Sequence, residues 1–225
     1  MEYSAKQFLQ DLENLSDNDV PPECKYIQAL CNGIEDHKAD FCKVLLSLGL
    51  IKNINYQQIE SKYTPLMIAV EYERHELIKI LLEHGADTEY TTIYGNTALL
   101  LAVIYQNHEI MKILLDAGAN VNVINTSKYT PLMYAIDNSQ IDDVKLLIEK
   151  GAKIDIDNLI MLIDTHDKDD VEILKLLMQG IKGKCCYGET CLNLAKGLCK
   201  LEHEIIKDDI INPLKIHTTE TIKDE

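Results

Sequence analysis

The motif Thr64-Pro-Leu-Met-Ile-Ala69 recurs every 33 residues, as Thr97-Ala-Leu-Leu-Leu-Ala102 and as Thr130-Pro-Leu-Met-Tyr-Ala135. A Gly-Ala pair keeps the same interval, beginning at Gly85 and recurring twice. Each Thr is placed to accept a backbone hydrogen bond at the start of a helix, which stabilises the helix by about 1 kcal/mol. A Gly can end the second helix in the left-handed conformation without steric cost. Two features in phase over three copies predict a repeated pair of helices.

The apolar residues of each copy fit two packed helices. Leu66 and its counterparts 33 and 66 residues later are expected to face the stack, while the Ala that ends each motif lets neighbouring helices approach closely. The segment Glu76-Leu-Ile-Lys-Ile-Leu-Leu82 presents an Ile/Leu stripe at helical spacing. The sequence therefore predicts that successive helix pairs bury their apolar faces against one another.

With these motifs the chain resembles the ankyrin repeat family, over residues 23–211. The resemblance implies an all-α solenoid of stacked helix-turn-helix units with β-hairpin finger loops. The chain departs from the family pattern at Lys62 and Lys128, where the family has Gly before the Thr. If these positions keep a positive φ, each Lys costs about 1–2 kcal/mol. Asp143 occupies a site that is usually apolar in the family, and we expect it to be exposed at a shifted helix start.

The period and its interruptions divide the chain into segments. The copy near residue 170 follows its predecessor after 27 residues, so it is expected to lack a finger. The predicted segments are an amphipathic helix and linker at 1–22, an irregular cap at 23–52, clear repeats at 62–94, 95–127 and 128–156, a finger-less repeat at 157–181, a C-terminal cap at 187–211 and a polar tail at 212–225.

Charge and composition narrow the possible partners. The net charge of −15 argues against nucleic acid and anionic membranes, because both attract basic surfaces. The first residues lack the pattern of a signal peptide, and no apolar run approaches the roughly 18 residues of a membrane span. The seven Cys fall mostly within helical patterns, which is typical of reduced thiols in a cytoplasmic protein. We therefore expect a cytoplasmic protein whose partner is another protein with a basic patch.

The family resemblance also nominates a binding surface. In ankyrin proteins the partner docks on the concave face, formed by the finger tips and the exposed side of each first helix. Tyr recurs at these positions, and exposed Tyr is favoured in interfaces. The alternative is that these tyrosines only cover neighbouring repeats. The positions that correspond in this chain are Tyr63, Glu71, Tyr72, Thr91, Ile93, Tyr94, Asn96, Ile104, Tyr105, Ile124, Thr126, Ser127, Tyr129, Asp137 and Asn138.

Several other functions remain as alternatives. Cys185, Cys186, Cys191, Cys199 and His203 gather near the C-terminus, and Cys199 and His203 share a helical face. A metal- or thiol-dependent activity there is an alternative to simple packing, although the spacing matches no common zinc motif, and we expect neither an enzyme nor a cofactor. An adaptor that recruits a second protein through a terminal segment is another alternative. The Lys-rich composition and the tail, which weakly resembles a secretion signal, suggest an effector secreted into a host cytoplasm.

Overall fold

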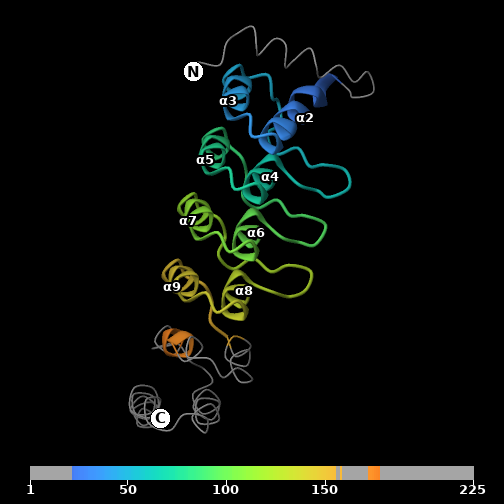
Figure 1. Ribbon diagram of the computed structural model, residues 1–225. Coiled ribbons are helices and arrows are strands. Elements are labelled where there is room, and N and C mark those ends of the chain that lie inside the picture. The colour runs from blue at the N-terminus through green and yellow to red at the C-terminus, as the bar shows by residue number, and fades with distance from the viewer. Residues whose placement is uncertain (1–21, 156–157, 159–171, 178–225) are drawn as a thin grey trace, which may run out of the picture. The chain divides into compact units, whose positions relative to one another are not determined.

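The computed structural model describes residues 22–155, 158 and 172–177, and the chain divides into two compact units, Met1–Tyr129 and Thr130–Glu225. Among its described residues, the first unit contains three helix pairs: α2 (Pro22–Glu35) with α3 (Ala39–Ser47), α4 (Pro65–Glu71) with α5 (His75–Glu83), and α6 (Ala98–Ile104) with α7 (His108–Asp116). Figure 1 shows α2, α4 and α6 in one row and α3, α5 and α7 in a second row, with long loops projecting beside the first. The predicted all-α stack of helix pairs is confirmed.

The expected helix signals act as predicted in this unit. Thr64 Oγ1 accepts a hydrogen bond from Met67 N at 3.3 Å, and Thr97 Oγ1 accepts one from Leu100 N at 3.4 Å. Pro65 opens α4, where its missing N–H is not needed. These local bonds define where α4 and α6 begin.

Packing within the first row follows the apolar pattern. The Leu and Ala side chains of each motif in this unit are buried, and α4 packs directly against α6. The Ala side chains have no exposed surface at all, which permits this close approach. The structure confirms that α4 and α6 bury their motif residues against each other.

A left-handed residue connects the two helices of each pair. Glu73 and Gln106 have φ of 57° and 58°, and the next residue donates its N–H back to the first helix, as Arg74 N does to Ala69 O at 2.8 Å. This geometry closes the C-terminal end of the short helix and reverses the chain. Each of these non-Gly residues carries a conformational cost of about 1–2 kcal/mol, which the packing of the pair offsets.

The fingers are joined to one another by backbone hydrogen bonds. Ile93 N donates to Ser61 O at 3.3 Å, and Thr126 N donates to Tyr94 O at 3.0 Å. Tight turns close the fingers, and no strand occurs among the residues that the structure describes. Lys62 and Lys128 keep the positive φ of the family's Gly, at 58° and 69°. The fingers of the first unit therefore form a linked series.

The second unit contains α8 (Pro131–Asp137), α9 (Ile141–Glu149) and a helical segment at 172–177. Thr130 Oγ1 accepts a hydrogen bond from Met133 N at 3.2 Å, as predicted for the third copy of the motif. Lys145 Nζ lies 3.1 Å from a carboxylate oxygen of Glu172, which ties α9 to the segment 27 residues later.

One expectation in this unit is wrong. The sequence pattern predicts an exposed Asp143, but only 4% of its surface is accessible. It lies in the first turn of α9, where free backbone N–H groups and the helix dipole stabilise a negative charge. This position explains why a carboxylate occupies a site that the family pattern leaves to apolar residues.

Several predicted segments lie outside the described residues: the N-terminal helix, most of the finger-less repeat, the C-terminal cap with its Cys cluster, and the tail. Among the helices that are described, none is both long and apolar enough to cross a membrane.

Candidate protein-binding site

Four apolar side chains on the three fingers of the first unit are at least half exposed. Ile59 is 89% exposed, Ile93 50%, Tyr94 65% and Ile124 61%. We call these four residues the finger-tip surface. Covering apolar surface is favourable by roughly 25 cal/mol per Å², so a partner that covers these side chains gains free energy. Consecutive exposed apolar residues of this kind are typical of an interaction site.

Tyr94 is held rigidly although its side chain is exposed. Its N–H donates to Thr92 Oγ1 at 3.3 Å, and its carbonyl accepts both Thr126 N at 3.0 Å and Thr126 Oγ1 at 2.8 Å. The next residue, Gly95, approaches the neighbouring finger so closely that a Cβ there would lie 2.9 Å from Thr126 N. The backbone on either side of the aromatic ring is therefore fixed before any partner binds, which lowers the entropy cost of binding.

A second feature is a cluster of three tyrosines and a carboxylate. Tyr105 Oη donates to Glu71 Oε1 at 3.4 Å and is also hydrogen-bonded to Tyr63. Tyr94 lies close enough to Tyr63 to affect its ionisation. We call Tyr63, Glu71, Tyr94 and Tyr105 the tyrosine cluster. Its members come from two fingers and from the C-terminal ends of α4 and α6, so the stacking of two repeats assembles it.

The environment of the cluster keeps the phenols of Tyr63 and Tyr105 neutral. Burial raises the pKa of Tyr105, and the hydrogen bond with Tyr63 and the Glu71 carboxylate raise it further. Burial also raises the pKa of Tyr63, although its hydrogen bond with Tyr105 opposes this effect. These tyrosines therefore serve as hydrogen-bonding and aromatic groups at physiological pH.

Other predicted site residues hold the fold together. Tyr72 lies under the Arg74 guanidinium, whose carbon is 5.7 Å from the ring centre. Asn96 Oδ1 accepts a hydrogen bond from Asn125 Nδ2 at 2.9 Å, and the hydroxyl of Thr126 is used by the Tyr94 carbonyl. These polar groups connect neighbouring parts of the first unit, so they are less available to a partner.

The remaining predicted residues differ in exposure and place. Thr91 and Ser127 are exposed on the fingers, whereas Ile104 and Tyr129 are half-buried. Asp137 and Asn138 are exposed at the end of α8, in the second unit. The assignment of all fifteen residues to a binding surface stays a prediction.

The sequence pattern did not identify two residues that are important in this unit. Ile59 lies on the first finger. A backbone hydrogen bond between Gln58 and Tyr63 closes the turn of this finger, and this turn holds one residue more than the turns of the later fingers. That extra length was a detectable sign of a different tip. Arg74 donates from Nε to Ile34 O at 3.1 Å and from an Nη atom to Glu35 O at 3.2 Å, at the end of α2. No local pattern indicates this contact over 40 residues.

The described residues show no sign of a reactive centre. Burial raises the pKa of the Cys31 and Cys42 thiols to about 12, so both stay protonated and unreactive. No group of three or more His, Cys, Asp or Glu residues in the described ranges is arranged to hold a metal ion. His75 and His84 each contact a backbone carbonyl of their own helix pair. The Cys cluster near the C-terminus lies outside these ranges.

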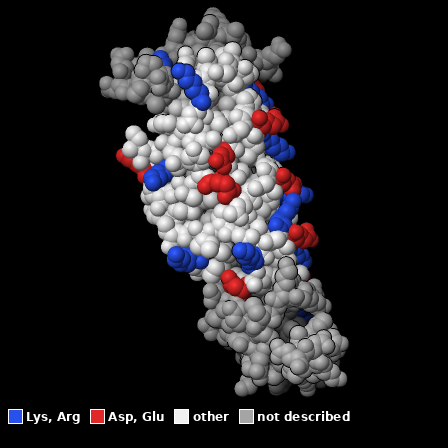
Figure 2. All heavy atoms as spheres, turned by 180° about the vertical axis from the view of Figure 1, so that it is seen from behind, with Lys and Arg blue, Asp and Glu red and all other residues white. Residues whose placement is uncertain are grey.

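The second row of helices (α3, α5 and α7), which we call the outer row, carries both acidic and basic side chains. Lys43 Nζ lies 2.7 Å from Glu76 Oε1, joining α3 to α5, and Figure 2 shows acidic and basic side chains interleaved along one edge. Residues 22–129 hold thirteen Asp and Glu against nine Lys and Arg, a net charge of −4 of the total −15. The described part of this unit therefore carries only a weak negative charge, and local charges decide its electrostatic preference.

Comparison with known proteins agrees with this architecture. The family described as ankyrin repeats (3 copies) matches residues 4–92 and 87–158, which together span more than half of the chain. A segment of 58 residues is 36% identical to the human 2-5A-dependent ribonuclease. That segment amounts to 26% of this chain and 8% of the human protein.

Proposed function

The chain belongs to the ankyrin repeat family, and we propose that it is a non-catalytic protein that binds a partner protein on the finger-tip surface and the adjoining tyrosine cluster. Ankyrin repeats typically bind other proteins, and solenoids of this kind offer extended surfaces for doing so. The nuclease activity in the name of the human relative does not enter the proposal, because the shared segment is only 8% of that protein.

The exposure of Ile59, Ile93 and Ile124 is the observation that carries this proposal. These side chains lie on three consecutive fingers. A large aromatic side chain, Tyr94, accompanies them on a fixed backbone. Rigid aromatic and aliphatic residues of this kind supply most of the binding free energy in protein interfaces.

The partner that fits this surface has an apolar patch beside a basic one. The weak net charge of residues 22–129 means that the attraction of a basic partner depends on local carboxylates, Glu71 among them. Binding should then weaken moderately as salt is added. A role inside a host cell stays a prediction.

Affinity capture from a host-cell lysate tests the proposal, with bound proteins identified by mass spectrometry. The full chain is compared with the double variant Ile93→Asp, Ile124→Asp. Leu48→Asp is the matched control, because Leu48 is 51% exposed and follows the outer helix α3. Losing central interface residues typically costs at least about 2 kcal/mol, so the double variant should lose most of the partner.

The control should retain that partner, and urea unfolding should show that all three proteins fold. Equal recovery of the same proteins by the wild type and the double variant would refute the proposed surface.

A further inference from the structure

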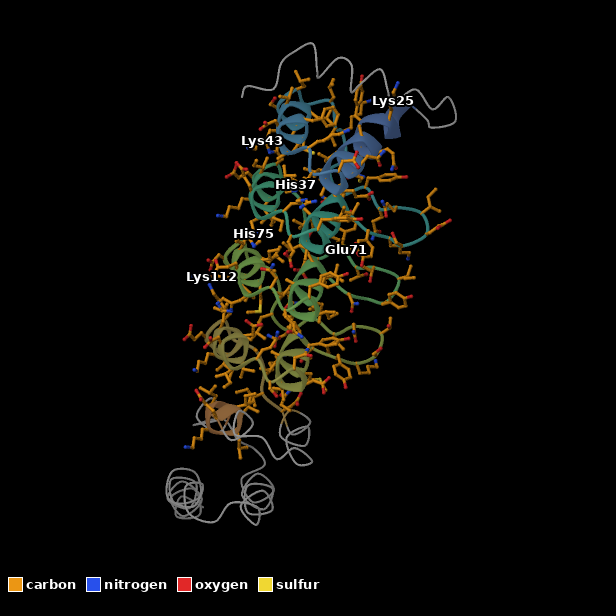
Figure 3. All side chains as sticks on the ribbon, in the orientation of Figure 1. Lys25, His37, Lys43, Glu71, His75 and Lys112 are labelled. Carbon is orange, nitrogen blue, oxygen red and sulfur yellow. The ribbon has the colours of Figure 1, made fainter. Side chains whose placement is uncertain are left out.

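Glu71 is an exposed carboxylate, and no cation among the described residues pairs with it. It is the last residue of α4, and Figure 3 labels it where α4 and α6 lie beside one another. None of the ion pairs among the described residues includes Glu71; its recorded contact is the 3.4 Å hydrogen bond from Tyr105. The nearby Arg74 guanidinium is directed to the carbonyls that end α2. The negative charge is therefore free to attract a cation from outside the chain.

A tyrosine contacts this carboxylate, and two more tyrosines lie near that one. Tyr105 is hydrogen-bonded to both Glu71 and Tyr63, and Tyr94 lies next to Tyr63 on the following finger. Tyr94 is 65% exposed and Tyr105 is 38% exposed, so ring surface remains open to a partner. The face of an aromatic ring attracts a cation, by about 0.5–1 kcal/mol at exposed sites and about 2 kcal/mol when water is displaced.

The backbone holds these rings in place. Tyr63 O accepts Gln58 N at 2.9 Å within the first finger, and Tyr105 N donates to Leu101 O at 2.9 Å at the end of α6. The carbonyl of Tyr94 is bonded to both the N–H and the hydroxyl of Thr126. A group that enters between these residues meets a pre-formed arrangement, which reduces the entropy cost of binding.

We infer that the tyrosine cluster receives one lysine or arginine side chain of the partner protein, with the cation against Glu71 and its aliphatic stem against the tyrosine rings. This inference rests on the proposed function, because it assigns one specific contact within that surface.

The chemistry of the cluster disfavours other occupants. Glu71 repels an anionic group, and a purely apolar group would remove water from the carboxylate without replacing its interactions. A basic side chain satisfies both features, since its charge pairs with the carboxylate while its methylene groups cover aromatic surface. The exposed Ile93 on the same finger as Tyr94 then accommodates an apolar neighbour of that basic residue.

A phage-displayed library of short random peptides, selected on the full chain, tests this inference while the natural partner is still unidentified. Enriched peptides are synthesised and their affinities measured by fluorescence polarisation. We expect them to share a Lys or Arg next to apolar residues. Glu71→Gln should weaken binding about 5- to 30-fold, which corresponds to losing about 1–2 kcal/mol.

Glu73→Gln is the matched control. Glu73 is an exposed carboxylate two residues away, and its replacement changes the net charge by the same amount. Its effect should stay below about twofold, because the exposed Glu73 carboxylate makes no hydrogen bond or ion pair with the tyrosine cluster. Replacing the basic residue of the peptide by norleucine should abolish the difference between wild type and Glu71→Gln, as expected for directly interacting groups.

The outcomes separate this inference from the proposed function. If binding is lost in Ile93→Asp, Ile124→Asp but is unchanged in Glu71→Gln, the basic contact is wrong and the binding surface stands. Enriched peptides without a common basic residue lead to the same conclusion. If no peptide is enriched, or if none depends on the Ile pair, the proposed function fails and this inference fails with it.

Discussion

Replacing Gly95 by Ala should destabilise the protein much more than the same change at Gly118. Both glycines have positive φ, 74° and 91°, so both substitutions introduce a conformational cost of about 1–2 kcal/mol. Ala also reduces the freedom of the unfolded chain, which returns about 0.4–1 kcal/mol. At Gly118, where a Cβ would have nothing within 4 Å, the net loss should be about 0.5–1.5 kcal/mol.

Gly95 has an additional constraint from the neighbouring finger. An added Cβ would lie 2.9 Å from Thr126 N and 3.3 Å from Asn125 Cα, both backbone atoms that cannot rotate away. The two fingers must separate, which weakens the hydrogen bonds from Thr126 N and Oγ1 to the Tyr94 carbonyl. Each bond contributes about 0.5–1.5 kcal/mol, so Gly95→Ala should cost about 1–3 kcal/mol more than Gly118→Ala.

Urea unfolding of the full chain, followed by circular dichroism, measures this difference. With a slope of roughly 2 kcal/mol per molar urea, the two midpoints should differ by about 0.5–1.5 M. In a Thr126→Val background one of the two hydrogen bonds is already absent, so the difference should shrink. Equal midpoints for Gly95→Ala and Gly118→Ala would show that contact between these fingers contributes nothing to stability.

Two further predictions concern the first helix pair. Arg74→Met should lower the free energy of unfolding by about 1–2 kcal/mol, because it removes a charged hydrogen-bond donor from the last carbonyls of α2. Lys79→Met, at an exposed site on α5, is the control and should have little effect in the same urea assay. The Cys31 and Cys42 thiols have a folded-state pKa raised from 9.0 to about 12, so their contribution to stability is present below pH 9 and is lost as the pH rises towards 12. Unfolding midpoints should therefore fall as the pH rises from 9 towards 12. The fall should be smaller in Cys31→Ala, Cys42→Ala, and an identical slope in both proteins would contradict the assigned cause.

Local sequence determined the helix pairs of this protein. Thr64 and Thr97 cap helices through atoms three residues away, and Gly118 ends one through its own conformational freedom. Such interactions depend on neighbours along the chain, so a motif of a few residues is enough to predict them. The 33-residue interval then repeats the same local solution, and this regularity predicts the stack.

Contacts between repeats determined which of the predicted site residues stay exposed and which residues meet. The sequence nominated Tyr94, Tyr105 and Asn96 alike, but only the stacked structure shows that Asn96 is engaged by Asn125 while Tyr94 stays exposed. The meeting of Tyr105 with Glu71 joins residues 34 positions apart. Such contacts depend on how two helices are placed and on which rotamers their side chains adopt. The periodicity of the sequence specifies neither the placement nor the rotamers, because the repeat interval is the same whether a given side chain faces a neighbouring repeat or the solvent.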